Sequence, residues 1–132
     1  MNISTIPKDE VAQHWVWLKP WVEKATGREV DGKPVSDILC DAVSGNSLIL
    51  VINEGNTVKC VSVLQLRPEA IHMQTLAGEG RKAWWGTYCD TVEKIARGLG
   101  KKYVTSLSRK GMLPSMEREQ FRVHNYYMVK EL

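Results

Sequence analysis

Two glycines and two basic residues stand together near the middle of the chain, at a spacing suited to holding an anion. Gly78, Glu79 and Gly80 interrupt an apolar run, and Arg81 and Lys82 open a helical pattern. A glycine turn between a strand and a helix leaves backbone N–H groups free at the positive end of the helix dipole. The two cations add formal charge there. The segment therefore predicts a site for phosphate or pyrophosphate.

A tight turn alone also explains these glycines, with the helix only covering a sheet. Both interpretations stay open, because a lone G-x-G pattern has low specificity. The phosphate-binding loop of P-loop nucleotidases is excluded, since no G-x-x-x-x-G-K-[ST] occurs. Residues 98–102 (GLGKK) follow a helical pattern instead of opening one, so they mark a helix end.

The turn needs a strand before it and a helix after it. Residues 70–76 form a short apolar run typical of a strand. After the turn, apolar residues recur at helical spacing up to Gly100, where a helix stop is expected. These apolar positions are Trp85, Tyr88, Cys89, Val92, Ile95, Ala96 and Leu99.

Two helices are predicted before this centre. The first begins at Asp9 or a neighbour, ends before Gly27 and holds apolar residues on one face. Pro20 lies inside that pattern, so we expect a kink or two abutting helices near Lys19. The second helix covers residues 34–45 and ends on a glycine.

Strands and one short helix account for most of the remainder. Turn residues join the first three strands into an antiparallel meander, and a helical crossover places the fourth parallel to the third. The predicted fold class is α/β (α+β): a mixed, mostly antiparallel sheet flanked by helices, in the order α-α-β-β-β-α-β-α-β. The strands are expected at residues 47–52, 57–66, 70–76, 103–108 and 123–130, with the short helix at 114–121.

Composition predicts a single domain over residues 1–132. The chain is 43% hydrophobic and 25% charged, which suits one core. No apolar run approaches the roughly 20 residues that cross a bilayer, and the start lacks a signal-peptide pattern. We therefore expect an intracellular protein without a membrane partner. Cys40, Cys60 and Cys89 are widely spaced in apolar segments, so we expect buried free thiols and no metal site.

Charge divides the chain into an acidic and a basic part. Residues 1–80 carry seven Lys and Arg against ten Asp and Glu, whereas residues 81–132 carry eleven against five. A nucleotide cofactor or a nucleic acid would suit the basic part, and so would plain solvent. Nucleic-acid binding rests on charge alone and ranks last. It would use Arg97, Lys101, Lys102, Arg109 and Lys110.

The element order and the glycine turn together resemble the GNAT superfamily of acyl-CoA-dependent N-acetyltransferases. More narrowly, the chain resembles small GNAT-like proteins of tailed bacteriophages. The segments that carry this second resemblance are HWVWLKPWVEKATG near the start, SRKGM after the fourth strand, and the final K-E-L.

The resemblance implies acetyl-CoA as the cofactor. In the superfamily a [Q/R]-x-x-G-x-[G/A] loop donates backbone N–H groups to the pyrophosphate of coenzyme A. Gly78 and Gly80 match its two small positions, and Thr75 stands at the leading position. The implied cofactor-binding residues are Gly78, Glu79, Gly80, Arg81 and Lys82, and the strand before them would hold the pantetheine arm.

The catalytic pattern of the superfamily is less complete. Many members place a tyrosine as general acid five residues before a Gly-Phe pair. Here Met116 and Gln120 replace the tyrosine and the glycine, and Phe121 matches. Residues 70–76 hold no carboxylate, which leaves His72 as the candidate base. A structural histidine is the alternative.

Two functions of different classes follow. The first is an N-acetyltransferase in which an amine of unknown identity attacks acetyl-CoA directly. The second is a non-catalytic phage virion component, or a module that binds a phage or host protein through its tryptophan-rich N-terminal helix. We expect either in the host cytoplasm or in the virion. A V-shaped gap between residues 70–76 and 103–108 would favour the first, and an exposed tryptophan patch the second.

Overall fold

A five-stranded sheet forms the centre of the protein, for which a computed structural model describes residues 1–26, 34–107, 112–122 and 130. Short turns connect β2 to β3 and β3 to β4, so these neighbours are antiparallel, and β1 also pairs antiparallel with β2. β5 follows a helical crossover and lies parallel to β4. In spatial order the strands are β1 (Asn2–Ile6), β2 (Ser47–Glu54), β3 (Thr57–Leu66), β4 (Ala70–Gly78) and β5 (Tyr103–Ser106).

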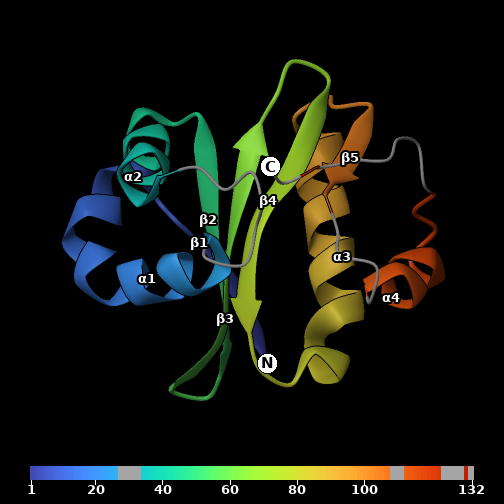
Figure 1. Ribbon diagram of the computed structural model, residues 1–132, viewed down its shortest axis with the longest axis horizontal. Helices are drawn as coiled ribbons and strands as arrows, with labels where there is room; N and C mark the ends of the chain where they lie inside the picture. The colour runs from blue at the N-terminus through green and yellow to red at the C-terminus, as the bar shows by residue number, and fades with distance from the viewer. Residues whose placement is uncertain (27–33, 108–111, 123–129, 131–132) are drawn as a thin grey trace.

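Helices cover both faces of this sheet (Figure 1). α1 and α2 lie on one face, and α3 with α4 lies on the other. Alternation along the central strands β2 and β3 feeds both cores, since Val61 and Val63 of β3 pack under α1 and α2, while Cys60 and Leu64 pack under α3. The helices are η1 (Lys8–Glu10), α1 (Val11–Thr26), α2 (Val35–Ser44), α3 (Arg81–Gly98) and α4 (Leu113–Arg118).

The predicted fold class is confirmed, with one strand more than expected at the start. Asn2–Ile6 pairs with β2 in a register that places Ile6 opposite Ile49. Only Ile3 and Ile6 of this strand are apolar and partly buried. So short a pattern gives little signal in the sequence. The strand is held mainly by its pairing with β2, which the local sequence does not contain. The expected last strand, residues 123–130, lies almost wholly outside the described residues.

α1 is one helix, where the sequence left a kink or two helices open. It continues from Val11 to Thr26 with Pro20 inside it. Leu18 and Val22 on either side of the proline are 0% and 1% exposed, so the buried face holds the helix together across it. The carbonyl that Pro20 leaves without a donor belongs to Val16, which is 87% exposed and therefore open to water.

The cysteines correct one expectation. All three are free thiols, and Cys60 and Cys89 are buried as predicted, but Cys40 is exposed on α2. Helical spacing explains this, since α2 turns Ile38 and Ala42 inward and Cys40 outward. Within the described residues no cluster of His, Cys, Asp or Glu could hold a metal ion. No helix in that part of the chain is long and apolar enough to span a bilayer.

Candidate functional site

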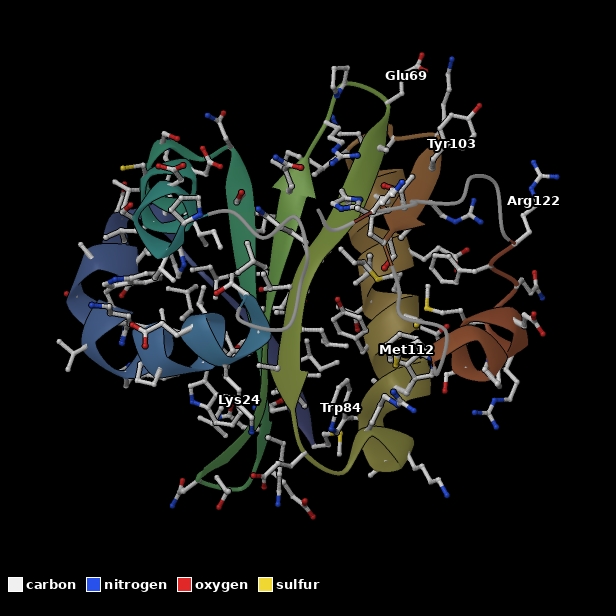
Figure 2. All side chains as sticks on the ribbon, in the orientation of Figure 1. Lys24, Glu69, Trp84, Tyr103, Met112 and Arg122 are labelled. Atoms are coloured by element: carbon white, nitrogen blue, oxygen red, sulfur yellow. The ribbon has the colours of Figure 1, made fainter. Side chains whose placement is uncertain are left out.

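The turn between β4 and α3 is the most open backbone junction of the candidate site. Gly80 caps the helix in the left-handed conformation, with φ 65° and ψ 38°. A side chain at this position would meet nothing within 4 Å. Figure 2 shows Trp84 beside the lower end of β4 and the first turns of α3, at the opposite end of these elements from Glu69 and Tyr103. The junction therefore combines a free surface with a well-packed base.

The backbone amides of this turn are not all available to a ligand. The N–H of Glu79 donates to the Lys59 carbonyl at 2.9 Å, which ties the turn to β3. The N–H of Ala83 donates to the Gly80 carbonyl, also at 2.9 Å. The first amides of a helix have no partner inside it. Within the described chain this leaves the amides of Gly80, Arg81 and Lys82 without a backbone acceptor.

Gly78 is a glycine because of packing. A Cβ at this position would lie 2.8 Å from the Cys60 Cβ, 2.8 Å from the Lys59 carbonyl oxygen and 2.9 Å from the Trp84 ring. The indole N–H of Trp84 donates to the Glu79 carbonyl at 2.8 Å. Trp84 is 2% exposed, and the helical pattern of the sequence did not single it out. Its place one helical turn before Tyr88 was the available signal.

β4 is paired with β5 over only part of its own length. The ladder joins Ala70–Met73 to Tyr103–Ser106, one residue with one. β4 then continues to Gly78, and residues 74–78 have no β5 partner in the part of the chain that the structure describes. β5 ends at Ser106, so the part of β4 that leads to the glycine turn extends beyond the last residue paired with β5, and a V-shaped gap between the two strands stays a prediction.

A β-bulge lies where β5 ends its pairing. The register of β3 with β4 shifts between Val63 opposite Thr75 and Leu64 opposite Met73, so Gln74 is the extra residue. The side-chain oxygens Oε1 of Gln74 and Oγ1 of Thr75 are buried, and neither has a hydrogen-bond partner among the described residues. Unpaired buried polar atoms are costly and uncommon in native structures. This part of β4 therefore suits a ligand with polar groups.

His72 is placed in the paired segment of β4 and not at its free end. It is 7% exposed, and its Nδ1 lies 2.8 Å from Oγ1 of Thr105 on β5. Burial, and secondarily the charge of Arg67, lowers the pKa of His72 to about 4. The imidazole is therefore neutral at pH 7 and able to accept a proton, while its environment disfavours the charged product.

The general-acid position of the superfamily is part of a packed core here. Met116 is 5% exposed, and Phe121 packs against the same cluster. The indole N–H of Trp85 donates to the Ser115 carbonyl at 3.1 Å and fixes α4 against α3. A thioether has no proton to give. α4 thus contributes packing at this position.

The buried thiols are not nucleophiles at neutral pH. Burial raises the pKa of Cys60 to about 12. Burial, followed by the nearby carboxylates of Glu119, Asp90 and Glu93, raises the pKa of Cys89 to about 12 as well. Since the thiolate is the reactive form, a covalent cysteine mechanism through either is disfavoured.

A shallow hollow lies between the glycine turn and α1. Its volume is about 230 Å³, and it is lined by Pro20, Trp21, Lys24 and Glu79. Lys24 lies in the second half of α1, close to the lower part of the sheet (Figure 2). The hollow thus places an aromatic ring and two opposite charges next to the glycine turn.

The tryptophans of α1 are only partly on the surface. Trp15 and Trp21 pack against the core between α1 and the sheet. Trp17 is 38% exposed, and its Nε1 donates to Nδ1 of His14 at 3.1 Å. The exposed aromatic area is therefore one ring, beside Val16.

Three of the five basic residues considered for nucleic-acid binding have partners within the chain. Arg97 pairs with Glu93 at 2.7 Å, and Lys102 pairs with Glu69 at 3.2 Å. The Lys101 ammonium donates to the Arg67 carbonyl at 2.8 Å. Residues 109 and 110 lie outside the described residues.

Neither a protein-family model nor a curated protein sequence matches this chain, whereas many solved structures do. A glucosamine-6-phosphate N-acetyltransferase from Arabidopsis thaliana matches with a TM-score of 0.68 at 12% identity, over 98% of this chain and 97% of its own. An acetyltransferase from Trypanosoma brucei matches with 0.66 at 15%, over 99% of both chains. A predicted acetyltransferase from Clostridium acetobutylicum, crystallised with acetyl-CoA, matches with 0.68 at 10%, over 98% and 95%.

These likenesses extend over nearly the whole of each chain, so they concern the complete architecture and not a shared motif. The protein has the fold of the GNAT acetyltransferases. At 10–15% identity the comparison establishes the fold alone.

Proposed function

We propose that the protein is an N-acetyltransferase that uses acetyl-CoA and an amine acceptor. The observation that carries the proposal is the course of β4, which continues beyond its last residue paired with β5, Met73, to a glycine turn at the start of α3. A cofactor with an extended arm and a pyrophosphate fits such a path. The GNAT fold, and a neighbour crystallised with acetyl-CoA, support the same function.

The proposed pyrophosphate site consists of the amides of Gly80, Arg81 and Lys82, with the Lys82 side chain nearby, while the Arg81 guanidinium contacts the Met112 sulfur. Gly78 lets the turn pack closely, and Glu79 lines the hollow beside it. Residues 74–78 would offer backbone groups to the pantetheine arm. From Gln74 to Gly78 the strand covers about 13 Å, along which part of the arm would lie.

Bound acetyl-CoA would supply the acetyl group: a C–N bond to the amine would form, the C–S bond would break, and coenzyme A would leave as a thiolate that takes up a proton from water. The bulge at Gln74 lies where an acetyl carbonyl would reach the free edge of β4, and backbone N–H groups there would stabilise its developing negative charge. His72 stays our candidate for the base that receives the amine proton. Its neutral form at pH 7 suits the role, and its burial calls for a water between it and the amine.

Calorimetry with acetyl-CoA and coenzyme A tests the cofactor site directly. Gly80→Glu places a negative charge at the proposed pyrophosphate and a side chain in a left-handed conformation, so we expect micromolar binding to be lost. Gly98→Glu is the matched control, because it adds the same charge at the far end of α3, where a side chain also meets nothing within 4 Å. We expect Gly98→Glu to bind as the wild type does.

Two outcomes would reject the site. No heat of binding to the wild-type protein at millimolar ligand would remove the acetyltransferase proposal. Equal loss in both variants would show that added charge, and not the turn, matters. Binding that only Gly80→Glu loses would justify a screen of amine acceptors, with release of the free thiol as the signal.

We also propose a phage origin, a cellular location and a protein partner for this acetyltransferase. The origin in a tailed phage, with a location in the host cytoplasm or the virion, is supported by the resemblance of the sequence segments alone. A protein partner at α1 would use Val16 and Trp17, which are 87% and 38% exposed. Mass spectrometry of purified virions, and cross-linking compared between wild type and Trp17→Ala, would test the location and the partner.

A further inference from the structure

Two side chains and one backbone carbonyl, from three different elements, form a buried hydrogen-bonded chain behind the β4 bulge. The Tyr88 hydroxyl on α3 lies 2.7 Å from Oγ of Ser62 on β3. Ser62 Oγ lies 3.0 Å from the carbonyl oxygen of Thr75 on β4. Both Ser62 and Tyr88 are 0% exposed. The contacts join residues far apart in the sequence.

The direction of the protons in this chain is determined by its chemistry. A carbonyl oxygen only accepts, so the single proton of Ser62 is donated to Thr75. Tyr88 must then donate its own proton to Ser62. Burial raises the pKa of Tyr88 above its ordinary value, so the phenol stays protonated and the order is constant.

The receiving carbonyl belongs to the residue that follows the bulge. A bulge disrupts the ladder locally and leaves peptide orientations less constrained by cross-strand bonds. The Ser62 hydroxyl provides a constraint there from the neighbouring strand. The peptide group between Gln74 and Thr75 is thus next to the Thr75 carbonyl, which the Ser62 hydroxyl holds. The side-chain oxygens of Gln74 and Thr75 are buried there and have no hydrogen-bond partner among the described residues.

The donor at the other end of the chain is itself held firmly. Trp85 stacks on Tyr88 with ring centres 5.7 Å apart, and Trp84 meets it edge-on at 6.0 Å. Trp84 also holds the Glu79 carbonyl through its indole N–H. One aromatic cluster therefore connects the bulge to the glycine turn, which are the two ends of the free segment of β4.

We propose that Ser62 and Tyr88 are positioning residues for the acyl end of the cofactor. They hold the bulge so that its peptide groups receive the thioester carbonyl, while the start of α3 holds the pyrophosphate. This inference rests on the proposed acetyl-CoA site. Coenzyme A lacks the acetyl group, so loss of the positioning contacts should weaken the binding of acetyl-CoA more than that of coenzyme A. A purely structural role of the two residues would weaken the binding of both ligands equally.

The test is calorimetry with both ligands on four variants. Ser62→Ala removes the bond to the bulge, and Tyr88→Phe removes only the bond behind it. We expect acetyl-CoA affinity to fall about tenfold in Ser62→Ala and about threefold in Tyr88→Phe, with coenzyme A changed less than about twofold. Ser47→Ala is the control for a buried serine whose hydroxyl has no partner among the described residues, and Tyr103→Phe for an exposed tyrosine.

Each outcome decides between the two proposals. If the wild type binds neither ligand, the acetyl-CoA site and this inference both fail. If it binds both, and Ser62→Ala and Tyr88→Phe weaken both equally or not at all, only the positioning role is overturned. Tyr88→Phe keeps the ring and its stacking, so it folds even if Ser62→Ala does not, and its ratio of affinities alone gives the answer.

Discussion

Gly78 and Gly80 stand two residues apart and owe their identity to different constraints. Gly78 needs to be small because strand β3 and Trp84 approach it, whereas Gly80 needs a left-handed backbone and has open space around it. Only the second is a feature that a ligand would use. The glycine pattern thus has a packing requirement at Gly78 and a conformational requirement at Gly80, where we propose that the ligand binds.

Replacing Gly78 with alanine should destabilise the protein by about 1–3 kcal/mol, because the new Cβ collides with two backbone or Cβ atoms that cannot turn away. Urea unfolding followed by tryptophan fluorescence would measure this. Gly98→Ala is the control, and there we expect a gain of up to about 1 kcal/mol, since Gly98 lies in a helix with free space. An unchanged midpoint for Gly78→Ala would contradict the close packing.

His72 predicts an acid-dependent loss of stability. Its pKa of about 4 in the folded protein lies below the ordinary 6.5, so the unfolded chain binds a proton first as the pH falls. The contribution is complete above pH 6.5 and is lost between pH 6.5 and 4, on the order of 3 kcal/mol. Unfolding free energies of wild type and His72→Gln across this window would measure it. Parallel pH profiles would show that His72 is not responsible.

At the scale of the element, α1 contains an internal proline without breaking. Pro20 is exposed, so the cost of the missing hydrogen bond is incurred on the wet side of the helix. Pro20 also lines the hollow next to Glu79.

Pro20→Ala should therefore stabilise the protein by about 1 kcal/mol or more, because it restores the bond to the Val16 carbonyl and relieves the ring's clash. Thermal unfolding by circular dichroism would show a higher midpoint and more helical signal. Lys19→Ala is the control, because it changes a side chain in the same stretch of α1 and adds no backbone hydrogen bond. A lower midpoint for Pro20→Ala would mean that the proline ring itself packs usefully.

At the scale of the whole molecule, the candidate cofactor path lies between the elements that join the two cores. β4 contributes to the core on α3 and also lies against α1, and the glycine turn extends from its end. A ligand bound along β4 would therefore stabilise the whole folded protein, which we expect to unfold as one cooperative unit. Binding to the native state alone raises stability by about 2.7 kcal/mol at a hundredfold excess over Kd.

A single thermal transition that shifts upward with acetyl-CoA concentration is the expected result. Scanning calorimetry from zero to millimolar ligand would follow it, with Gly80→Glu as the protein that should not respond. Two transitions, of which only one moves, would show that the layers unfold separately and that the ligand contacts one of them.

The sequence by itself determined which segments become helices and strands in most of the chain, since hydrophobic periodicity and glycine or proline signals act locally. β3 was predicted with its observed ends, and Gly45 and Gly100 end their helices in left-handed conformations as expected. It also located the glycine turn. For these features the determining residues are neighbours in the chain.

Only the tertiary structure decided what depends on contacts between distant segments. β1 exists because β2 pairs with it, and α1 stays whole because its buried face packs on the sheet. The division of labour between Gly78 and Gly80, the bulge at Gln74 and the Tyr88–Ser62–Thr75 chain all require the register of β3 with β4. That register is set by the packing of the whole sheet, which no local pattern in the sequence contains.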